Sequence, residues 1–272
     1  MGLFHIRLGP NKVSFIGLLQ PLLDAFKLLS KQVVTPLHSN KVVYNFSPML
    51  ALFLSLYVWA FMVFSFSFTS GCFSFLMFFC VGSFIVFSVL ISGWSSNSKY
   101  SLIGRLRSVA QSISYESVFR TLLVLVVFLL CSFRLKSCSS QSSLLFWVFF
   151  PIWVVCTLAE THRAPFDFRE AESELVSGFN TEYSGAYFAF IFLSEYSMLL
   201  FSSMLIVWLF IGFVVGLSHL FLVFNALLVS FFFIWIRITF CRFRYDKLMA
   251  VSWKVLLPSS IMILLVYICL VF

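Results

Sequence analysis

Carboxylic acids are scarce in this chain, and they are unevenly placed. The 272 residues include ten Asp or Glu against 18 Lys or Arg. Seven of the ten acids fall between Glu160 and Glu195, in ETHRAPFDFREAESELVSGFNTEYSGAYFAFIFLSEY. A plain hydrophilic loop mixes both signs of charge, but here the acids face only Arg163 and Arg169. Acids gathered in this way can load and release protons, so the segment is the first candidate for proton chemistry.

Two acids, Glu116 and Glu195, stand inside apolar stretches of the chain. An ionised carboxylate at the centre of a membrane costs about 2.5–3.5 kcal/mol on insertion scales, so such residues face a protein interior, pair or stay protonated. Glu116 lies one helical turn before Arg120, which leaves two readings open: a structural ion pair or a relay acid. Glu195 has no basic residue within a turn, and we expect it to be protonated or to lie in a hydrated pocket. The sequence therefore favours a role for Glu195 in proton transfer.

Redox cofactors and metals are not indicated for this chain. Its seven Cys contain no C-x-x-C spacing, which argues against an iron–sulfur cluster or a zinc site. No two of its four His share a face of one apolar helix, so a bis-His haem carrier is not indicated either. Gly-rich phosphate loops and a Ser–His–Asp order are also missing. We expect no metal and no cofactor to be bound by this chain.

The elements that must position these acids are membrane helices. Hydrophobic residues make up 61% of the chain and charged residues 10%, with a mean hydropathy of +1.04, whereas soluble domains carry about 25% charged residues. Met1 to Lys12 is polar and basic, so we expect no cleaved targeting segment. The sequence predicts a single integral membrane domain over residues 1–272, an all-α polytopic helical bundle. About seven spanning helices are expected, over residues 46–68, 72–93, 108–131, 144–160, 186–211, 218–239 and 254–272.

The basic residues predict the orientation of this bundle. Fifteen of the 18 fall in segments on the side of the N-terminus, and only Arg134 and Lys136 fall on the opposite side. This asymmetry follows the positive-inside rule and places the N-terminus inside and the C-terminus outside. The acidic loop, residues 160–185, then lies on the inside as an island of negative charge.

An amphipathic segment precedes the first predicted span. In residues 17–31, GLLQPLLDAFKLLSK, one helical face carries Leu and Phe, and the other carries Gln20, Asp24, Lys27 and Lys31. A helix of this length with a polar stripe suits the membrane surface better than the membrane interior. We expect an interfacial helix over residues 13–31.

Four polar stretches of this chain carry a resemblance to a known family. They are IRLGPNKVSFIGLLQPLLDAFKLLSK, SGWSSNSKYSLIGRLRSVAQSISYE, LAETHRAPFDFREAESELVSGFNTEYSG and WIRITFCRFRYDKLMAVSWKVLLP. In content, order and spacing they resemble the quinone-chamber membrane subunits of mitochondrial NADH:ubiquinone oxidoreductase, respiratory complex I. The resemblance runs from about Arg7 to Phe272.

This resemblance implies roles for particular residues. Quinone-chamber residues would be Arg7, Asp24, Lys27, Arg163, Asp167 and Glu170. Relay acids leading inward would be Glu116, Glu160, Glu182 and Glu195. Residues that shape the loop or anchor the subunit interface would be Glu172, Glu174, Arg237, Arg242, Arg244 and Asp246.

The resemblance also implies the setting of the chain. Its partners would be the quinone-site subunits of the peripheral arm, the neighbouring antiporter-like membrane subunits and lipids, with no nucleic acid. Quinone would be the substrate, and flavin and iron–sulfur clusters would lie in partner subunits. The location would be the mitochondrial inner membrane, and a further spanning helix would be expected before the R-x-G-P-N segment.

Two other functions are compatible with membrane carboxylates. A stand-alone proton- or ion-coupled secondary transporter would use Glu195 and Glu116 as its ion site, but such transporters carry internal repeats and none is found in this sequence. The homologous subunit of a membrane-bound hydrogenase is the second alternative. A purely structural anchor would leave the buried acids unexplained.

Overall fold

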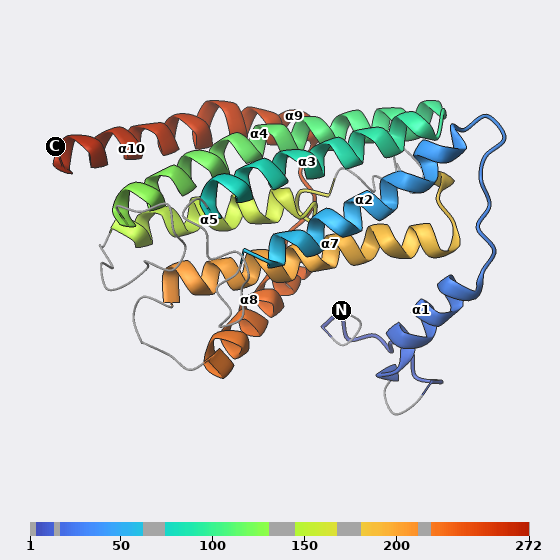
Figure 1. The fold of residues 1–272 in the computed structure, drawn as a ribbon. Helices are drawn as coiled ribbons and strands as arrows, with labels where there is room; N and C mark the ends of the chain where they lie inside the picture. Colours follow the sequence, from blue (N-terminus) through green and yellow to red (C-terminus); the bar gives the residue numbers. More distant parts are fainter. Residues whose placement is uncertain are drawn as a thin grey trace.

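The structure is a computed structural model that describes residues 4–13, 17–61, 74–130, 145–167, 181–211 and 219–271. Within these ranges every regular element is a helix, which confirms the predicted all-α bundle. Most helices run side by side along one direction, while α1 lies apart from them (Figure 1). The helices are α1 (Gln20–Ser30), α2 (Lys41–Trp59), α3 (Ser74–Ser95), α4 (Lys99–Leu130), α5 (Leu145–Glu160), α7 (Gly185–Ile206), α8 (His219–Thr239), α9 (Tyr245–Val251) and α10 (Leu257–Val271), with π-helical turns η4 (Val207–Ile211) and η5 (Ser252–Leu256).

Among the described residues, six helical segments are long and apolar enough to cross a membrane. They correspond to six of the predicted spans, and α9, η5 and α10 together supply the last of these. The predicted span over residues 144–160 coincides with α5, which has 16 residues and is the shortest of the seven helices that match predicted spans, apart from the composite last one. The chain is therefore a multi-pass membrane protein, and the count of seven spans stays a prediction.

Two of the spanning helices begin earlier than hydropathy predicts. α2 begins at Lys41 rather than near residue 46, and α4 begins at Lys99 rather than near residue 108. The additional turns contain Lys, Arg and Ser, which lower hydropathy but do not break a helix. Hydropathy detects the part of a helix that suits lipid, whereas the hydrogen-bonded helix continues past it towards water.

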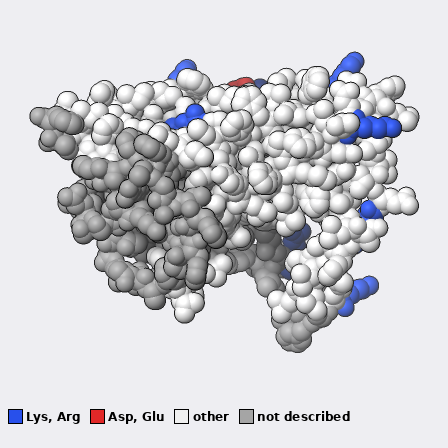
Figure 2. All heavy atoms as spheres, viewed as in Figure 1, with Lys and Arg blue, Asp and Glu red and all other residues white. Residues whose placement is uncertain are grey.

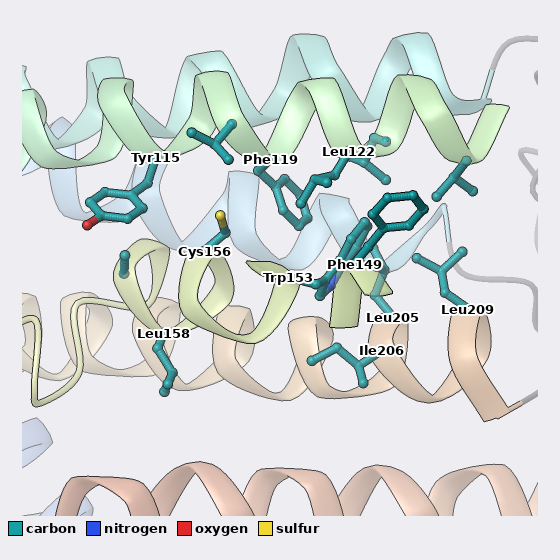
Figure 3. Close-up of a cluster of buried hydrophobic side chains, with 14 of the residues drawn as sticks. Tyr115, Phe119, Leu122, Phe149, Trp153, Cys156, Leu158, Leu205, Ile206 and Leu209 are labelled. Carbon is teal, nitrogen blue, oxygen red and sulfur yellow. The ribbon is translucent and has the colours of Figure 1, made fainter. Parts of the chain in front are cut away.

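The core of the bundle lies where α4, α5 and α7 meet (Figure 3). Phe119 and Trp153 pack with ring centroids 4.8 Å apart, and Trp153 also contacts Phe210 edge-on at 5.8 Å. α2 packs between α3 and α7, α3 packs on α4, and α10 packs on the opposite side of α4. This arrangement surrounds α4 with neighbours, so side chains on several of its faces are removed from lipid.

Charged side chains are sparse on the surface shown in Figure 2, and its Lys and Arg lie mostly towards the right-hand half and around α1. In Figure 1 this half contains the start of α2 and the turn between α3 and α4. It is the end that the positive-inside rule assigns to the inside.

The N-terminal helix α1 lies within the segment for which the sequence predicts an interfacial helix. It covers Gln20–Ser30, which is shorter than the predicted 13–31, and residues 14–16 are outside the described ranges. None of its residues is buried, and Leu18, Leu22 and Phe26 are all more than half exposed. Its apolar face is thus open to a membrane or a partner, and its position at the membrane surface stays a prediction.

The contact between α1 and the bundle is at the start of α7. Gly185 has φ +57, and a Cβ there would lie 3.2 Å from the carbonyl oxygen of Lys31. The backbone N–H of Val34 donates a hydrogen bond to the Ser184 hydroxyl at 3.2 Å. Glycine is required at residue 185 because the chain approaches so closely in a left-handed conformation.

Candidate functional site

A cavity of about 130 Å³ lies among α2, α3, α4, α5 and α7. This is room for several water molecules. Its lining includes apolar side chains together with hydroxyl and charged groups. The charged side chains that line it are Arg105, Glu116, Arg120, Glu160 and Glu195. Three of the four predicted relay acids, supplied by three different helices, therefore share one space, which we call the acid cavity.

Helix α4 supplies a polar stripe to the acid cavity. Arg105, Ser112, Glu116 and Arg120 all line it, at spacings of seven, four and four residues. Such spacings keep side chains on one face of an α-helix with 3.6 residues per turn. The face that looks polar in sequence is thus the face turned away from lipid.

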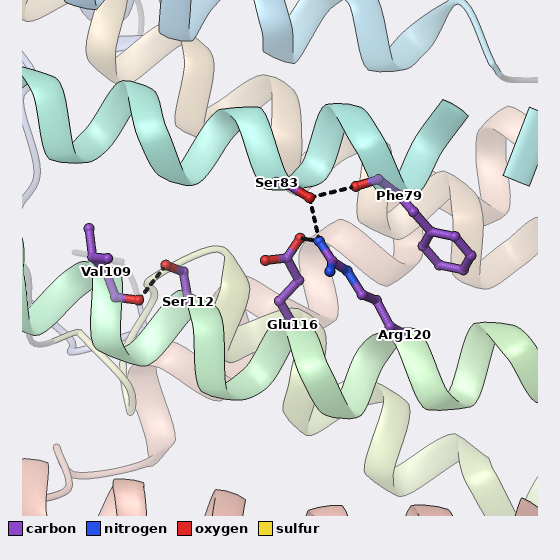
Figure 4. A network of polar contacts seen from close by, with 6 residues as sticks. All are labelled: Phe79, Ser83, Val109, Ser112, Glu116 and Arg120. Carbon is purple, nitrogen blue, oxygen red and sulfur yellow. Dashed lines mark hydrogen bonds and ion pairs between the residues drawn. The ribbon is translucent and has the colours of Figure 1, made fainter. Parts of the chain in front are cut away.

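Glu116 and Arg120 form an ion pair, as one of the two readings of the sequence predicted. The same guanidinium group donates a hydrogen bond to the Ser83 hydroxyl of α3 at 2.6 Å (Figure 4). A Cβ at Gly82 would lie 3.2 Å from Oε1 of Glu116, so α3 leaves just enough room for this carboxyl group. On the neighbouring helix, Gly82 therefore leaves space for the Glu116 carboxyl group, and Ser83 accepts a hydrogen bond from Arg120.

Glu160 and Glu195 approach the acid cavity from α5 and α7. Glu160 is the last residue of α5, and it lies close enough to Glu116 and Arg120 to interact with them electrostatically. Glu195 lies in the third turn of α7, and its Oε1 atom is buried. The arrangement places three carboxyl groups and two guanidinium groups around a space that can hold water.

The end of α5 is fixed to α4 by a buried amide. Gln111 is fully buried, and its Nε2 donates hydrogen bonds to the carbonyl oxygens of Ala159 at 3.0 Å and Phe166 at 2.9 Å. Glu160 and the first residues of the acidic loop over residues 160–185, which we call the inside loop, are thereby held against α4. Sequence reasoning missed Gln111, although a glutamine four residues from Arg107 and five from Glu116 was a signal for a polar contact between helices.

Arg105 is a second residue that sequence reasoning missed. It is one of the fifteen basic residues that the sequence places on the inside, and its side chain is 3% exposed and lines the acid cavity. A Cβ on Gly93 of α3 would lie 2.1 Å from Cγ of Arg105, so the arginine stem packs directly on the glycine backbone. The signal in the sequence was the helical spacing of Arg105 from Glu116, three turns apart on one face.

The predicted quinone-chamber residues do not gather in the acid cavity. Arg7, Asp24 and Lys27 are exposed on the N-terminal segment and α1, where Gln20 donates a hydrogen bond to Asp24 at 2.9 Å. Arg163 and Asp167 are half-buried at the start of the inside loop. Glu170, Glu172 and Glu174 lie outside the described residues.

Arg163 instead connects the inside loop to the helix of Glu195. Its guanidinium carbon lies 4.4 Å from the ring centroid of Tyr196, the residue that follows Glu195. A guanidinium over an aromatic face is held by the negative charge of the ring. The start of the inside loop is therefore in direct contact with α7.

The predicted interface residues at the C-terminal turn are exposed. Arg244 and Asp246 form an ion pair at 3.0 Å at the start of α9, with both side chains more than two-thirds exposed. Arg242 is exposed as well, and Arg237 is half-buried in the last turn of α8. Exposed pairs of this kind contribute little to folding. The interface role of these residues stays a prediction.

In the described part of the chain, no three His, Cys, Asp or Glu side chains lie close enough together to hold a metal ion. The ionisable side chains that line the acid cavity are three carboxyl groups, two guanidinium groups and the imidazole of His162. Their chemistry is proton exchange and charge stabilisation.

Almost the whole chain is similar in sequence to known proteins of one family. A sequence model described as NADH dehydrogenase matches residues 1–268. A curated protein of Aedes aegypti named NADH-ubiquinone oxidoreductase chain 1 is 49% identical over 266 residues, which cover 96% of this chain and 84% of that protein. The proteins of the same name from Anopheles gambiae and Locusta migratoria are 48% and 47% identical, over 96% and 98% of this chain and 84% and 86% of their own lengths. The chain therefore belongs to the NADH dehydrogenase family.

Proposed function

We propose that this chain, a core membrane subunit of an NADH:quinone oxidoreductase, forms part of the quinone chamber and carries an acidic relay that couples quinone reduction to proton translocation. The observation that carries the proposal is the convergence of Glu116, Glu160 and Glu195 on one cavity inside the helical bundle. Membership of the NADH dehydrogenase family favours this function over a stand-alone secondary transporter.

The chemistry of quinone reduction explains why acids would be placed there. Reduction of a quinone takes up two electrons and two protons, and it leaves transient negative charge in a poorly hydrated space. At an effective dielectric constant of about 20, a unit charge about 4 Å away changes the energy of its neighbour by about 4 kcal/mol. Such a change is large enough to alter whether a nearby carboxyl group holds a proton. A row of carboxyl groups can therefore convert a redox event into proton transfer.

Partner subunits would supply what this chain lacks. The electrons would come from flavin and iron–sulfur clusters in the peripheral arm, and protons would pass to antiporter-like membrane subunits. The exposed Arg7, Asp24 and Lys27 and the half-buried Arg163 and Asp167 would face a quinone chamber that is complete only against the peripheral arm. The setting would be the mitochondrial inner membrane, with the inside loop in the matrix.

The proposal is tested by separating quinone binding from proton coupling in the assembled enzyme. Asp24→Asn and Arg7→Ala should raise the apparent KM for ubiquinone severalfold with little change in kcat, because these side chains would guide the quinone rather than exchange protons. Glu160→Gln should lower coupled turnover with little change in KM. Steady-state kinetics in proteoliposomes measure both constants. Unchanged quinone kinetics in both N-terminal variants would remove Arg7 and Asp24 from the chamber, and normal proton translocation by Glu160→Gln would remove Glu160 from the relay.

A further inference from the structure

Two buried tyrosines lie between the inside loop and the acid cavity. Tyr44, in the first turn of α2, is 0% exposed, and Tyr183, two residues before α7, is 4% exposed. Their rings are stacked in parallel, with centroids 4.3 Å apart and 3° between the planes. Tyr187 packs edge-on against Tyr44 at 6.4 Å. Neither tyrosine belongs to the proposed relay.

The hydroxyl groups of this pair fasten the end of the inside loop to two helices. Tyr44 donates a short hydrogen bond to the carbonyl oxygen of Glu182. Tyr183 donates to the carbonyl oxygen of Ser92 on α3 at 3.1 Å, and its hydroxyl lies 3.0 Å from the Ser47 hydroxyl on α2. A buried tyrosine needs a partner for its hydroxyl, and both tyrosines satisfy this need with the loop or with its neighbours.

This tyrosine pair borders the acid cavity. Ser47, Ser92 and Ile191 are lining residues of the cavity, and each contacts or packs against the pair. Glu182 is not a lining residue, but its carboxyl group lies close enough to the Tyr44 hydroxyl to interact with it electrostatically. The pair thus connects the wall of the acid cavity to the fourth predicted relay acid.

The hydrogen bonds define what the pair can do. Both tyrosine hydroxyl protons are donated to backbone carbonyls, and a carbonyl oxygen has no proton to pass on. The pair in this arrangement is therefore a clamp and not a proton wire. Its effect is to fix the backbone at Glu182 and Tyr183, and hence the place from which the Glu182 carboxyl group extends.

We propose that Tyr44 and Tyr183 are positioning residues that hold Glu182 at the inside end of the acid cavity, so that this loop acid exchanges protons with the cavity. The proposal rests on the relay proposed above. Protons would then enter through Glu182, a loop acid that lies outside the cavity itself. The hydrogen bonds of the two tyrosines link the end of the inside loop to both α2 and α3.

The test uses Tyr44→Phe and Tyr183→Phe in the assembled enzyme, with Tyr187→Phe as the matched control. Each substitution keeps the ring and removes one hydroxyl, and the described residues offer the Tyr187 hydroxyl no hydrogen bond that would be lost. The readout is the rate of NADH-driven proton translocation in proteoliposomes and its pH profile. Electron transfer to a soluble acceptor that takes electrons before the quinone serves as the check that the rest of the enzyme is intact. We expect a roughly three- to tenfold loss for the first two variants, the scale of one lost hydrogen bond, and none for the control.

A double-mutant cycle with Glu182→Gln separates positioning from general destabilisation. If the tyrosines act through Glu182, Tyr44→Phe should add no further loss in a Glu182→Gln background. A full additional loss in that background, or an equal loss in Tyr187→Phe, would overturn the proposal. An unimpaired Glu182→Gln variant would overturn it as well, and the relay itself would still stand if Glu195→Gln lowers translocation. Normal translocation in both glutamine variants would instead contradict the relay.

Discussion

Replacing Glu195 by Gln should lower quinone reduction coupled to proton translocation at least about tenfold, while the complex still assembles. Glutamine has nearly the shape of glutamate and can make hydrogen bonds, but it cannot bind and release a proton. The Glu195 side chain lines the acid cavity from α7, and its Oε1 atom is buried. The cavity is therefore the space with which it would exchange a proton. The loss should appear in the protons moved as well as in the electrons transferred, because the two steps are coupled.

The measurement is proton uptake and NADH oxidation in proteoliposomes that contain the assembled enzyme. Asp246→Asn is the matched control, since it makes the same carboxyl-to-amide change at an exposed position outside the cavity. It should leave both rates within experimental error. Because Asp246 is predicted to lie at the subunit interface, both rates are expressed per assembled complex. An assembled Glu195→Gln enzyme with normal coupled turnover would contradict the relay role.

Replacing Arg120 by Ala should reduce both stability and coupled activity. The change removes the ion pair to Glu116 and the hydrogen bond to Ser83, so a partly buried carboxyl group loses its cation. Removing one partner of a fully buried pair costs roughly 3–5 kcal/mol. Because the Arg120 side chain is 39% exposed to the cavity, we expect a smaller cost of about 1–3 kcal/mol. The assembled complex should therefore unfold at a lower temperature.

A second substitution distinguishes the structural part of this effect from the functional part. In the double variant Arg120→Ala with Glu116→Gln, no carboxylate is left without a cation, so thermal stability should recover in large part. Coupled activity should stay low, because Glu116 is lost from the relay. Arg244→Ala is the control for the loss of an exposed pair and should change the unfolding temperature little. Recovery of both stability and activity in the double variant would make the pair purely structural.

The helices could be predicted from the sequence because lipid imposes one requirement on all of them. A spanning segment must satisfy its own backbone hydrogen bonds and must be apolar over about 20 residues, and both conditions are written in local sequence. The early starts of α2 and α4 could not be read in the same way, since the added helical residues, 41–45 and 99–107, include Lys, Arg, Asn and Ser that lower the local hydropathy. Hydropathy has no means of distinguishing a polar helical turn from a loop.

The site was predicted in part. Glu116 and Glu195 could be singled out because an ionised carboxylate in an apolar segment is energetically costly. In the structure they line one cavity together with Glu160. Their cationic neighbour Arg105 was not conspicuous, because it stands in a segment where basic residues are ordinary. The contacts of Tyr44 with Glu182 join residues far apart in the chain, and no local pattern reveals such a pairing.

The length of α4 restricts how charge can be rearranged in this protein. Its 32 residues form one uninterrupted helix of about 48 Å, longer than the roughly 30 Å hydrocarbon layer. Glu116 is the eleventh residue after Arg105, so the Cα atoms of the two residues stay about 16 Å apart along the helix axis. Any change in the electrostatic balance between them must then come from rotating side chains, from moving water, or from the neighbouring helices that bring in Glu160 and Glu195.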